Sequence, residues 1–280
     1  MRASLAAGWA TLLAVLLWSA PVHAVLISNE PFGYSSIGPA SVDLLGKNGG
    51  TGWGSPWKAG AFNASITTNY DIGSGSLVLP GNNYSTGNRT TSTQPQTGIS
   101  GLIRDFDSPI PSTATQTMWL SVLLRPENPV NQGAFNGFFG IYLRGSLTDV
   151  FIGKPGGGSL FNYVVEERGG GSQLVGSGSA SVAANQIKQL VMRVDLTPGA
   201  DLFRLAVNPA TPISTLQPGL NLNIGNVLGV AVYSSGAHSV DEIRWGTTFA
   251  DVIPEPSSIW LTVAGLAGAV CWAWRKRVPG

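Results

Sequence analysis

Side chains that could perform acid–base or metal chemistry are few in this chain. Its 280 residues include two histidines, His23 and His238, and one cysteine, Cys271. A metal centre built on several histidines is therefore excluded, and a Ser-His-Asp triad would have to use His238. No Gly-x-Ser-x-Gly elbow accompanies that residue. We therefore interpret His238 as a turn residue that precedes the last strand.

Carboxylates are spaced in a way that could hold calcium. Asp105 and Asp107 lie two residues apart and would share one face of a strand. The other acids placed near turns are Asp149, Asp195 and Asp201. No Asp-x-Asp-x-Asp-Gly loop supports a calcium site, so we interpret these acids as surface charge at strand ends and predict no cofactor.

Two tryptophans, Trp53 and Trp57, lie in a glycine-rich segment. Their rings could form an aromatic platform for sugar rings, which is the carbohydrate-binding hypothesis for this chain. The alternative is that they cap a hydrophobic core, as large aromatic side chains beside a glycine turn often do.

Short runs of alternating apolar residues position these candidates. In the run 190–196, Leu190, Met192, Val194 and Leu196 share one face, which predicts a strand with one buried face. A turn at 197–199 separates this run from 202–207, so the two should form a hairpin. Similar runs occur at 117–124, 138–143, 150–152, 160–165, 228–233 and 240–245. The polar stretch 82–97 is expected to be a surface loop.

Composition favours one all-β domain. The chain has 37 glycines, 18 prolines and only 11% charged residues, which suits many short strands and turns. Between Val25 and Ile253, twelve basic residues face fourteen acidic ones, a net charge of about −2. With no basic stripe, nucleic acid is excluded as a partner. Because Cys271 is the sole cysteine, the fold must form without an intramolecular disulfide.

The first 24 residues have the three parts of a secretory signal. Arg2 comes first, an apolar stretch runs from Leu5 to Trp18, and Val22-His23-Ala24 ends in a small residue. We therefore predict a signal helix over 1–24 that signal peptidase cleaves after Ala24. The alternative is an uncleaved N-terminal membrane anchor, for which the apolar run is short.

The C-terminal segment 254–280 has a second ordered pattern. The motif Pro254-Glu255-Pro256 precedes an apolar run, 259–274, which is followed at once by Arg275-Lys276-Arg277. Sixteen helical residues reach about 24 Å, and interfacial tryptophans and snorkelling cations can extend that reach, so we predict a transmembrane helix over 259–274. The basic cluster favours the cytoplasmic side, which places the body outside. A glycolipid-anchor signal is the alternative, but such tails normally end apolar.

This order of proline motif, apolar helix and basic end resembles the PEP-CTERM sorting signal of bacteria that make extracellular polysaccharide. The resemblance covers residues 254–277. It implies that an exosortase, a membrane-embedded cysteine protease-transpeptidase, recognises Pro254, Glu255 and Pro256, while Arg275, Lys276 and Arg277 stop translocation. The alternative is a proline-rich linker ahead of a permanent membrane anchor.

The body, residues 25–253, resembles concanavalin A-like and laminin-G-like sandwiches. The residues that carry this resemblance are Gly49 to Trp53, Met118 to Ser121 and Asp241 to Gly246. That fold hosts lectins, hydrolases and structural modules alike.

The sequence does not show the carboxylate pair that glycosidases of this fold require. Such enzymes resemble one another in a Glu-x-Asp-x-x-Glu strand, and that motif is absent here. Glu166 and Glu167 are adjacent, as are Asp241 and Glu242, so the members of each pair should point to opposite faces of a strand.

Together these patterns predict an antiparallel jelly-roll β-sandwich between a signal helix and a transmembrane helix. We expect an exported, non-enzymatic protein of the cell surface or extracellular matrix, which crosses the inner membrane and associates with extracellular polysaccharide. The alternatives are a lectin-like carbohydrate-binding module and a divergent carbohydrate-active enzyme whose carboxylates meet only in the fold.

Overall fold

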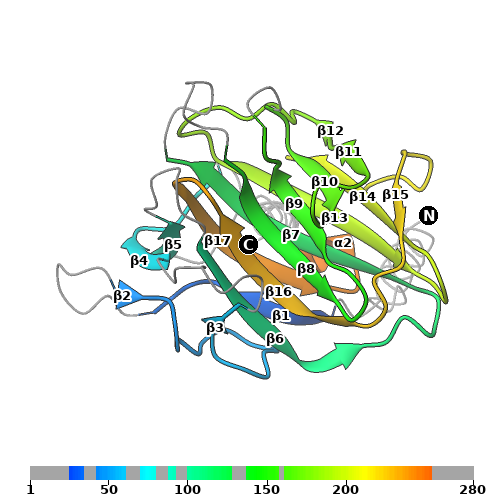
Figure 1. The fold of residues 1–280 in the computed structure, drawn as a ribbon, viewed down its shortest axis with the longest axis horizontal. Helices are drawn as coiled ribbons and strands as arrows, with labels where there is room; N and C mark the ends of the chain where they lie inside the picture. The colour runs from blue at the N-terminus through cyan, green and yellow to red at the C-terminus, as the bar shows by residue number, and fades with distance from the viewer. Residues whose placement is uncertain are drawn as a thin grey trace, which may run out of the picture.

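Two β-sheets packed face to face make up the body (Figure 1). The computed structural model describes residues 25–34, 42–60, 70–79, 88–92, 100–127, 137–157 and 161–253. One hydrophobic core, drawn from both sheets, lies between them. In Figure 1 the smaller sheet, which contains β8, β9 and β16, lies in front of the larger one.

The larger sheet has ten strands in the order β12-β14-β13-β7-β17-β5-β4-β2, with β1 beside β17 and β15 beside β14. Its strands are β1 (Leu26–Glu30), β2 (Val42–Asp43), β4 (Tyr70–Ser74), β5 (Asn88–Ser92), β7 (Gln116–Pro126), β12 (Ser177–Gly178), β13 (Lys188–Leu196), β14 (Asp201–Val207), β15 (Leu220–Leu222) and β17 (His238–Gly246). All pairings are antiparallel except that of β12 with β14.

The smaller sheet has seven strands in the order β11-β10-β9-β8-β16-β6-β3. Its strands are β3 (Lys58–Ala59), β6 (Ser100–Ile110), β8 (Phe139–Gly145), β9 (Val150–Lys154), β10 (Val164–Glu167), β11 (Gln173–Val175) and β16 (Val227–Ser234). All of its pairings are antiparallel.

The hairpin expected over 190–207 is confirmed. β13 pairs antiparallel with β14, with Met192 opposite Leu205, and the alternate residues Leu190, Met192, Val194 and Leu196 all lie in the main core. The other face of β13 is not simply solvated, because Val191 is buried in a second apolar cluster.

The remaining expected strands fall in β7, β8, β9, β10, β16 and β17. Two expectations need correction. β10 begins at Val164, later than the predicted start, and Leu160 lies outside the described residues. Within the stretch expected to be a loop, β5 forms a strand between β4 and β17, because backbone pairing to two neighbours and the strand-favouring Thr90 and Thr91 outweigh the weak strand propensity of Asn88.

One short helix, α2 (Phe249–Val252), closes the described part of the chain. Thr248 and Asp251 form a capping box, in which each side chain accepts a hydrogen bond from the other residue's backbone N–H. Val252 is buried against Trp119 and Val191 on the outer face of the ten-stranded sheet. α2 therefore lies on the side of the molecule opposite the seven-stranded sheet.

The predicted signal helix over 1–24, the cleavage position at Ala24 and the tail over 254–280 lie outside the described residues. Within the described ranges, no helix is long and apolar enough to cross a membrane.

Candidate functional site

The two tryptophans proposed as a sugar platform pack under the N-terminal segment. Trp57 is fully buried and its ring stacks on Phe32, with 5.9 Å between ring centroids. Trp53 is half-buried and stacks on Phe106 at 5.3 Å. The Trp57 Nε1–H donates a hydrogen bond to Glu30 Oε2 at 3.1 Å. Trp57 therefore has no ring face open to a sugar, and the pair closes the core.

A buried arginine occupies the space beside both indole rings. The Arg104 guanidinium carbon lies 4.9 Å from the Trp53 ring centroid and 5.8 Å from that of Trp57. Its Nη1 forms an ion pair with Glu30, and both side chains are fully buried. The other guanidinium N–H groups donate to the Ser55 carbonyl at 3.0 Å, to Asn48 Oδ1 at 2.9 Å and to the Gly49 carbonyl at 2.6 Å.

Glu30 is equally well satisfied. It accepts hydrogen bonds from the Phe32 backbone N–H at 2.8 Å and from the Tyr34 hydroxyl at 2.7 Å. Burial raises the pKa of Glu30, against the opposing effect of the Arg104 charge and these hydrogen bonds. The sequence carried a signal for this cluster that a search for apolar alternation passes over, because the residue concerned is charged. Arg104 lies two residues after Leu102 in β6 and therefore points to the same, core-facing side of the strand.

His238 is buried in the core, so its interpretation as a turn residue is wrong. It is the first residue of β17 and packs against Tyr70 and Phe139, with ring centroids 5.8 and 5.2 Å away. Nδ1 lies 3.3 Å from the Gly236 carbonyl, and Nε2 has no hydrogen-bond partner among the described residues. Burial lowers the pKa of His238 to about 4, which keeps the imidazole neutral near pH 7.

The alternation expected across Asp241 and Glu242 is broken by a β-bulge. The register of β17 shifts between Asp241 and Arg244, and Glu242 adopts a left-handed conformation with φ of 50°. Asp241 accepts hydrogen bonds from the Leu77 and Glu242 backbone N–H groups, while Glu242 pairs with Arg244. Burial raises the pKa of Asp241 to about 8. Both carboxyl groups are buried and closed to a substrate.

The acids weighed as calcium ligands serve other purposes in the described structure. Three of them form ion pairs: Asp105 with Lys58 and Arg144, Asp149 with Arg168, and Asp195 with Arg193 and Arg204. Asp201 accepts hydrogen bonds from the Thr197 and Ile224 backbone N–H groups. Asp107 is exposed. Within the described ranges, no three His, Cys, Asp or Glu side chains come together in a way that could hold a metal ion.

The outer face of the seven-stranded sheet carries an open aromatic cavity of about 480 Å³. Its aromatic lining consists of Phe138, Tyr142, Phe151 and Tyr233. Neighbouring rings are in contact, with centroid separations of 5.1 Å between Tyr142 and Phe151, 5.4 Å between Tyr142 and Tyr233, and 5.0 Å between Phe138 and Tyr233. Sequence patterning missed this group because its members lie on three separate segments.

Strand register explains why these side chains meet. Direct pairing places Glu166, Phe151, Tyr142, Ala231 and Ile103 in one row across β10, β9, β8, β16 and β6. Directly paired residues present their side chains on the same face, with Cβ atoms about 5 Å apart. The row therefore gives the groove an acid at one end and apolar side chains in the middle.

Two glycines next to this row make room for the rings. Gly140 pairs with Tyr233 on one side and with Gly153 on the other. A Cβ atom at Gly140 or Gly153 would lie 2.9 or 2.8 Å from a ring carbon of Phe151. Bare backbone at these positions therefore lets Phe151 lie close against the sheet.

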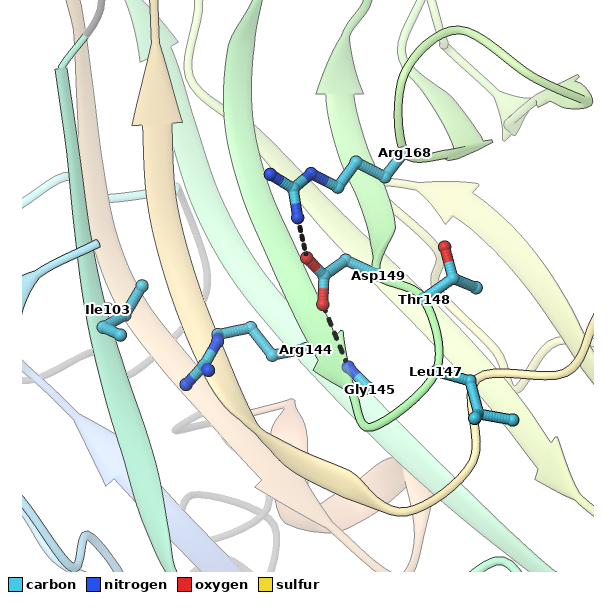
Figure 2. Close-up of a pocket in the computed structure, with 7 residues that line it drawn as sticks. All are labelled: Ile103, Arg144, Gly145, Leu147, Thr148, Asp149 and Arg168. Atoms are coloured by element: carbon cyan, nitrogen blue, oxygen red, sulfur yellow. Dashed lines mark hydrogen bonds and ion pairs between the residues drawn. The ribbon is translucent and has the colours of Figure 1, made fainter. Parts of the chain in front are cut away.

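A smaller polar cavity of about 270 Å³ adjoins the aromatic one (Figure 2). Arg168 donates a hydrogen bond to Asp149 Oδ2 at 3.0 Å, and Asp149 Oδ1 accepts the Gly145 N–H at 3.1 Å. Figure 2 shows Arg144 on the side of the cavity facing Ile103, across from Asp149. Arg168 lines both cavities, so the two are neighbours on this face, and we call them together the groove, with an aromatic half and a polar half.

The charges along the groove have different environments. Burial raises the pKa of Glu166, although the Gly170 backbone N–H opposes the shift. Burial would also raise the pKa of Asp105, but hydrogen bonds and charge from Lys58 and Arg144 outweigh it and lower that pKa. Glu166, in the aromatic half, is therefore easier to protonate than a free carboxyl group, whereas Asp105, which pairs with the lining residue Arg144, is harder to protonate.

Comparison with known protein families identifies the C-terminal segment. Residues 252–277 match the PEP-CTERM protein-sorting motif. This motif implies an exported protein that is processed by an exosortase, as the sequence predicted. The motif begins at Val252, the last residue of α2, so it follows the folded body without a spacer. No curated protein matches the chain.

Solved structures of similar fold include carbohydrate-active enzymes and lectins. An endo-1,3-β-glucanase from Streptomyces sioyaensis is 11% identical, with 81% of this chain and 98% of that chain covered and a TM-score of 0.42. A glycosyl hydrolase family 16 protein from Mycobacterium smegmatis is 12% identical, covering 79% and 100%, with a TM-score of 0.38. A Lotus tetragonolobus seed lectin is 8% identical, covering 60% and 89%, with a TM-score of 0.34.

Proposed function

We propose that this protein is an exported surface or matrix component that binds a carbohydrate chain along the outer face of its seven-stranded sheet. The sorting tail brings it to the membrane, where an exosortase acts on Pro254-Glu255-Pro256, and the cleaved signal ends at Ala24. The bound chain is part of the extracellular polysaccharide.

The aromatic half of the groove is the observation that supports this function. Sugar rings present flat C–H faces, which the partly exposed rings of Phe138 and Tyr233 can cover, while Tyr142 and Phe151 are themselves buried and support them. Tyr142 and Tyr233 add hydroxyl groups beside the rings, and Arg168 adds guanidinium N–H donors. A groove that combines an apolar floor with a few polar groups at its rim is the usual composition of a small-molecule site.

A glycan screen on residues 25–253, which contain both sheets, tests the proposal. Saturable binding is expected, and Tyr233→Ala should weaken it at least tenfold, which corresponds to about 1.4 kcal/mol. Tyr233→Phe keeps the ring and should retain most of the affinity. Leu45→Ala removes an exposed apolar side chain outside the groove and should change nothing. Binding that survives Tyr233→Ala unchanged would refute the aromatic groove as the site.

A second candidate function is enzymatic cleavage of the bound chain, by hydrolysis or by elimination. The observation that favours it is that Glu166 and Asp149 both line the groove, and the pKa of Glu166 is raised, as a general acid requires. Release of new chain ends from the bound glycan, abolished by Glu166→Gln with binding retained, would establish an enzyme. Binding without any product release over long incubation would establish a passive module.

A further inference from the structure

The two ends of the body leave the fold at neighbouring points on one face. The Thr247 backbone N–H donates a hydrogen bond to the Val25 carbonyl at 3.2 Å, and Leu26 pairs with Gly246. Val25 follows the expected signal cleavage position, and Thr247 lies just before α2, whose last residue, Val252, is the first of the sorting motif. Both membrane-directed segments of the chain are therefore attached at the same place.

This place belongs to the outer face of the ten-stranded sheet. Register pairing places Leu26, Gly246, Trp119, Arg193 and Arg204 in one row across β1, β17, β7, β13 and β14. α2 covers the middle of the row through Val252 and Phe249, which pack with Trp119. The segment 208–219 covers the other end, where Arg193 donates to the Ile213 carbonyl and Arg204 to the Thr215 and Gln217 carbonyls.

We call α2 together with residues 25–26 and 208–219 the α2 face. Its surface is almost free of charge and combines exposed apolar side chains with small polar ones. The twelve residues 208–219 include no charged side chain, and the one acid in α2, Asp251, is buried in the capping box. Leu216 is 93% exposed, and Val25 and Leu26 are also exposed. Exposed apolar side chains gathered around a chain exit indicate a contact surface.

The length of the tail decides what this surface meets. Five residues separate Ile253 from the apolar run that starts at Ile259. An extended chain advances about 3.5 Å per residue, so this stretch spans at most about 20 Å. The headgroup layer of one leaflet takes up about 5 to 8 Å of that distance. While the tail is embedded in the bilayer, the end of α2 must lie within about 15 Å of the headgroup surface.

We propose that, before the tail is processed, the α2 face rests on the outer leaflet of the membrane that the chain has crossed. The proposal rests on the proposed function only in that the tail spans the membrane. The seven-stranded sheet forms the opposite layer of the sandwich, so its groove points away from the bilayer (Figure 1). The protein is thus held with its glycan groove facing outward while it awaits the exosortase.

Fluorescence quenching by spin-labelled lipid tests this orientation on the full chain. Leu216→Cys and Leu147→Cys are each made in a Cys271→Ser background, labelled, and reconstituted into phosphatidylethanolamine and phosphatidylglycerol vesicles. Leu147 is the matched control, because it is 68% exposed and lines the polar cavity on the other layer. Quenching at position 216 is expected to exceed that at position 147 several-fold. In residues 25–253 alone, quenching at both positions should be low and equal.

Several outcomes would overturn the proposal. Equal quenching at the two positions of the full chain, or stronger quenching at 147, would refute the orientation. If the reconstituted protein had twice the mass of one chain and the label at position 216 were shielded from the lipid quencher, a second copy of the chain would cover the α2 face instead of the membrane. A full chain that does not float with vesicles would refute the membrane-spanning tail, while glycan binding by residues 25–253 would stand or fall separately.

Discussion

Two groups of aromatic residues in this protein have opposite fates. The group around Trp53 and Trp57 closes over the Arg104–Glu30 ion pair, and Trp57 is fully buried. The group formed by Phe138, Tyr142, Phe151 and Tyr233 lines an open groove on the seven-stranded sheet. The first group satisfies a buried charge. In the second group Tyr142 and Phe151 are buried, and only Phe138 and Tyr233 are partly open to solvent.

The difference teaches that what covers an aromatic cluster decides its role. Residues 26–34 and 44–58 fold over Trp57 and supply Glu30 and backbone carbonyls to Arg104. Over the aromatic half of the groove, the described chain places only the turns at 155–156 and 168–170 along the rim. The first cluster therefore contributes to stability and the second to binding, and each contribution can be measured separately.

The largest effect is expected from Arg104→Ala. The substitution leaves Glu30 buried without its charged partner, which should lower the free energy of unfolding by about 3 to 5 kcal/mol. Urea denaturation of residues 25–253 measures this loss. Glycan affinity of the fraction that remains folded should be unchanged, because Arg104 does not line the groove. A loss under 1 kcal/mol would show that the ion pair is not desolvated as described.

Acidification should destabilise the core through His238. Its folded pKa, about 4, lies below the unfolded value near 6.5, so between these values the unfolded state binds more protons. Stability contributed by the neutral imidazole is full above pH 6.5 and is lost as the pH falls toward 4, by up to about 3 kcal/mol. From pH 6.5 to 4, the free energy of unfolding of the wild type should fall more steeply than that of His238→Phe, which has no imidazole to protonate; urea denaturation at each pH measures both. The same pH dependence of unfolding free energy in both proteins from pH 7 to 4 would contradict the lowered pKa of His238.

Arg168→Ala should affect binding more than folding. Its ion pair with Asp149 is partly exposed, so its loss should cost at most about 1 kcal/mol of stability. Because Arg168 lines both halves of the groove, glycan affinity should fall about threefold to tenfold, which titration calorimetry would detect. Unchanged affinity would confine the site to the aromatic half.

The smallest effect is expected from Lys58→Ala. Lys58 and Asp105 form a partly exposed pair at 2.5 Å, and Asp105 keeps Arg144 as a second partner. The expected loss is under about 1 kcal/mol and should shrink further as salt is added. If Lys58→Ala lowered the free energy of unfolding as much as Arg104→Ala, solvent exposure would not explain the difference expected between the two ion pairs.

Much of the fold was present in local sequence patterns. The alternation over 190–207 predicted a hairpin that forms with the expected core face, because a strand's period of two is a local property. The C-terminal segment was also readable alone, since a proline motif, an apolar run and a basic end are contiguous, and the sorting motif expected over 254–277 is confirmed by the match at 252–277. β5 was missed because its pairing to β4 and β17, more than its own composition, holds it in the sheet.

The candidate site was decided by tertiary structure. Trp53 and Trp57 are close in sequence, and that closeness suggested a platform, yet whether their rings are open depends on which distant segment folds over them. Tyr142, Phe151 and Tyr233 are far apart in sequence and meet only through the register of β8, β9 and β16. The sequence by itself determined the all-β body and its sorting address, because both follow from contiguous residues. Which aromatic rings face solvent depends on long-range pairing, so only the fold could determine it.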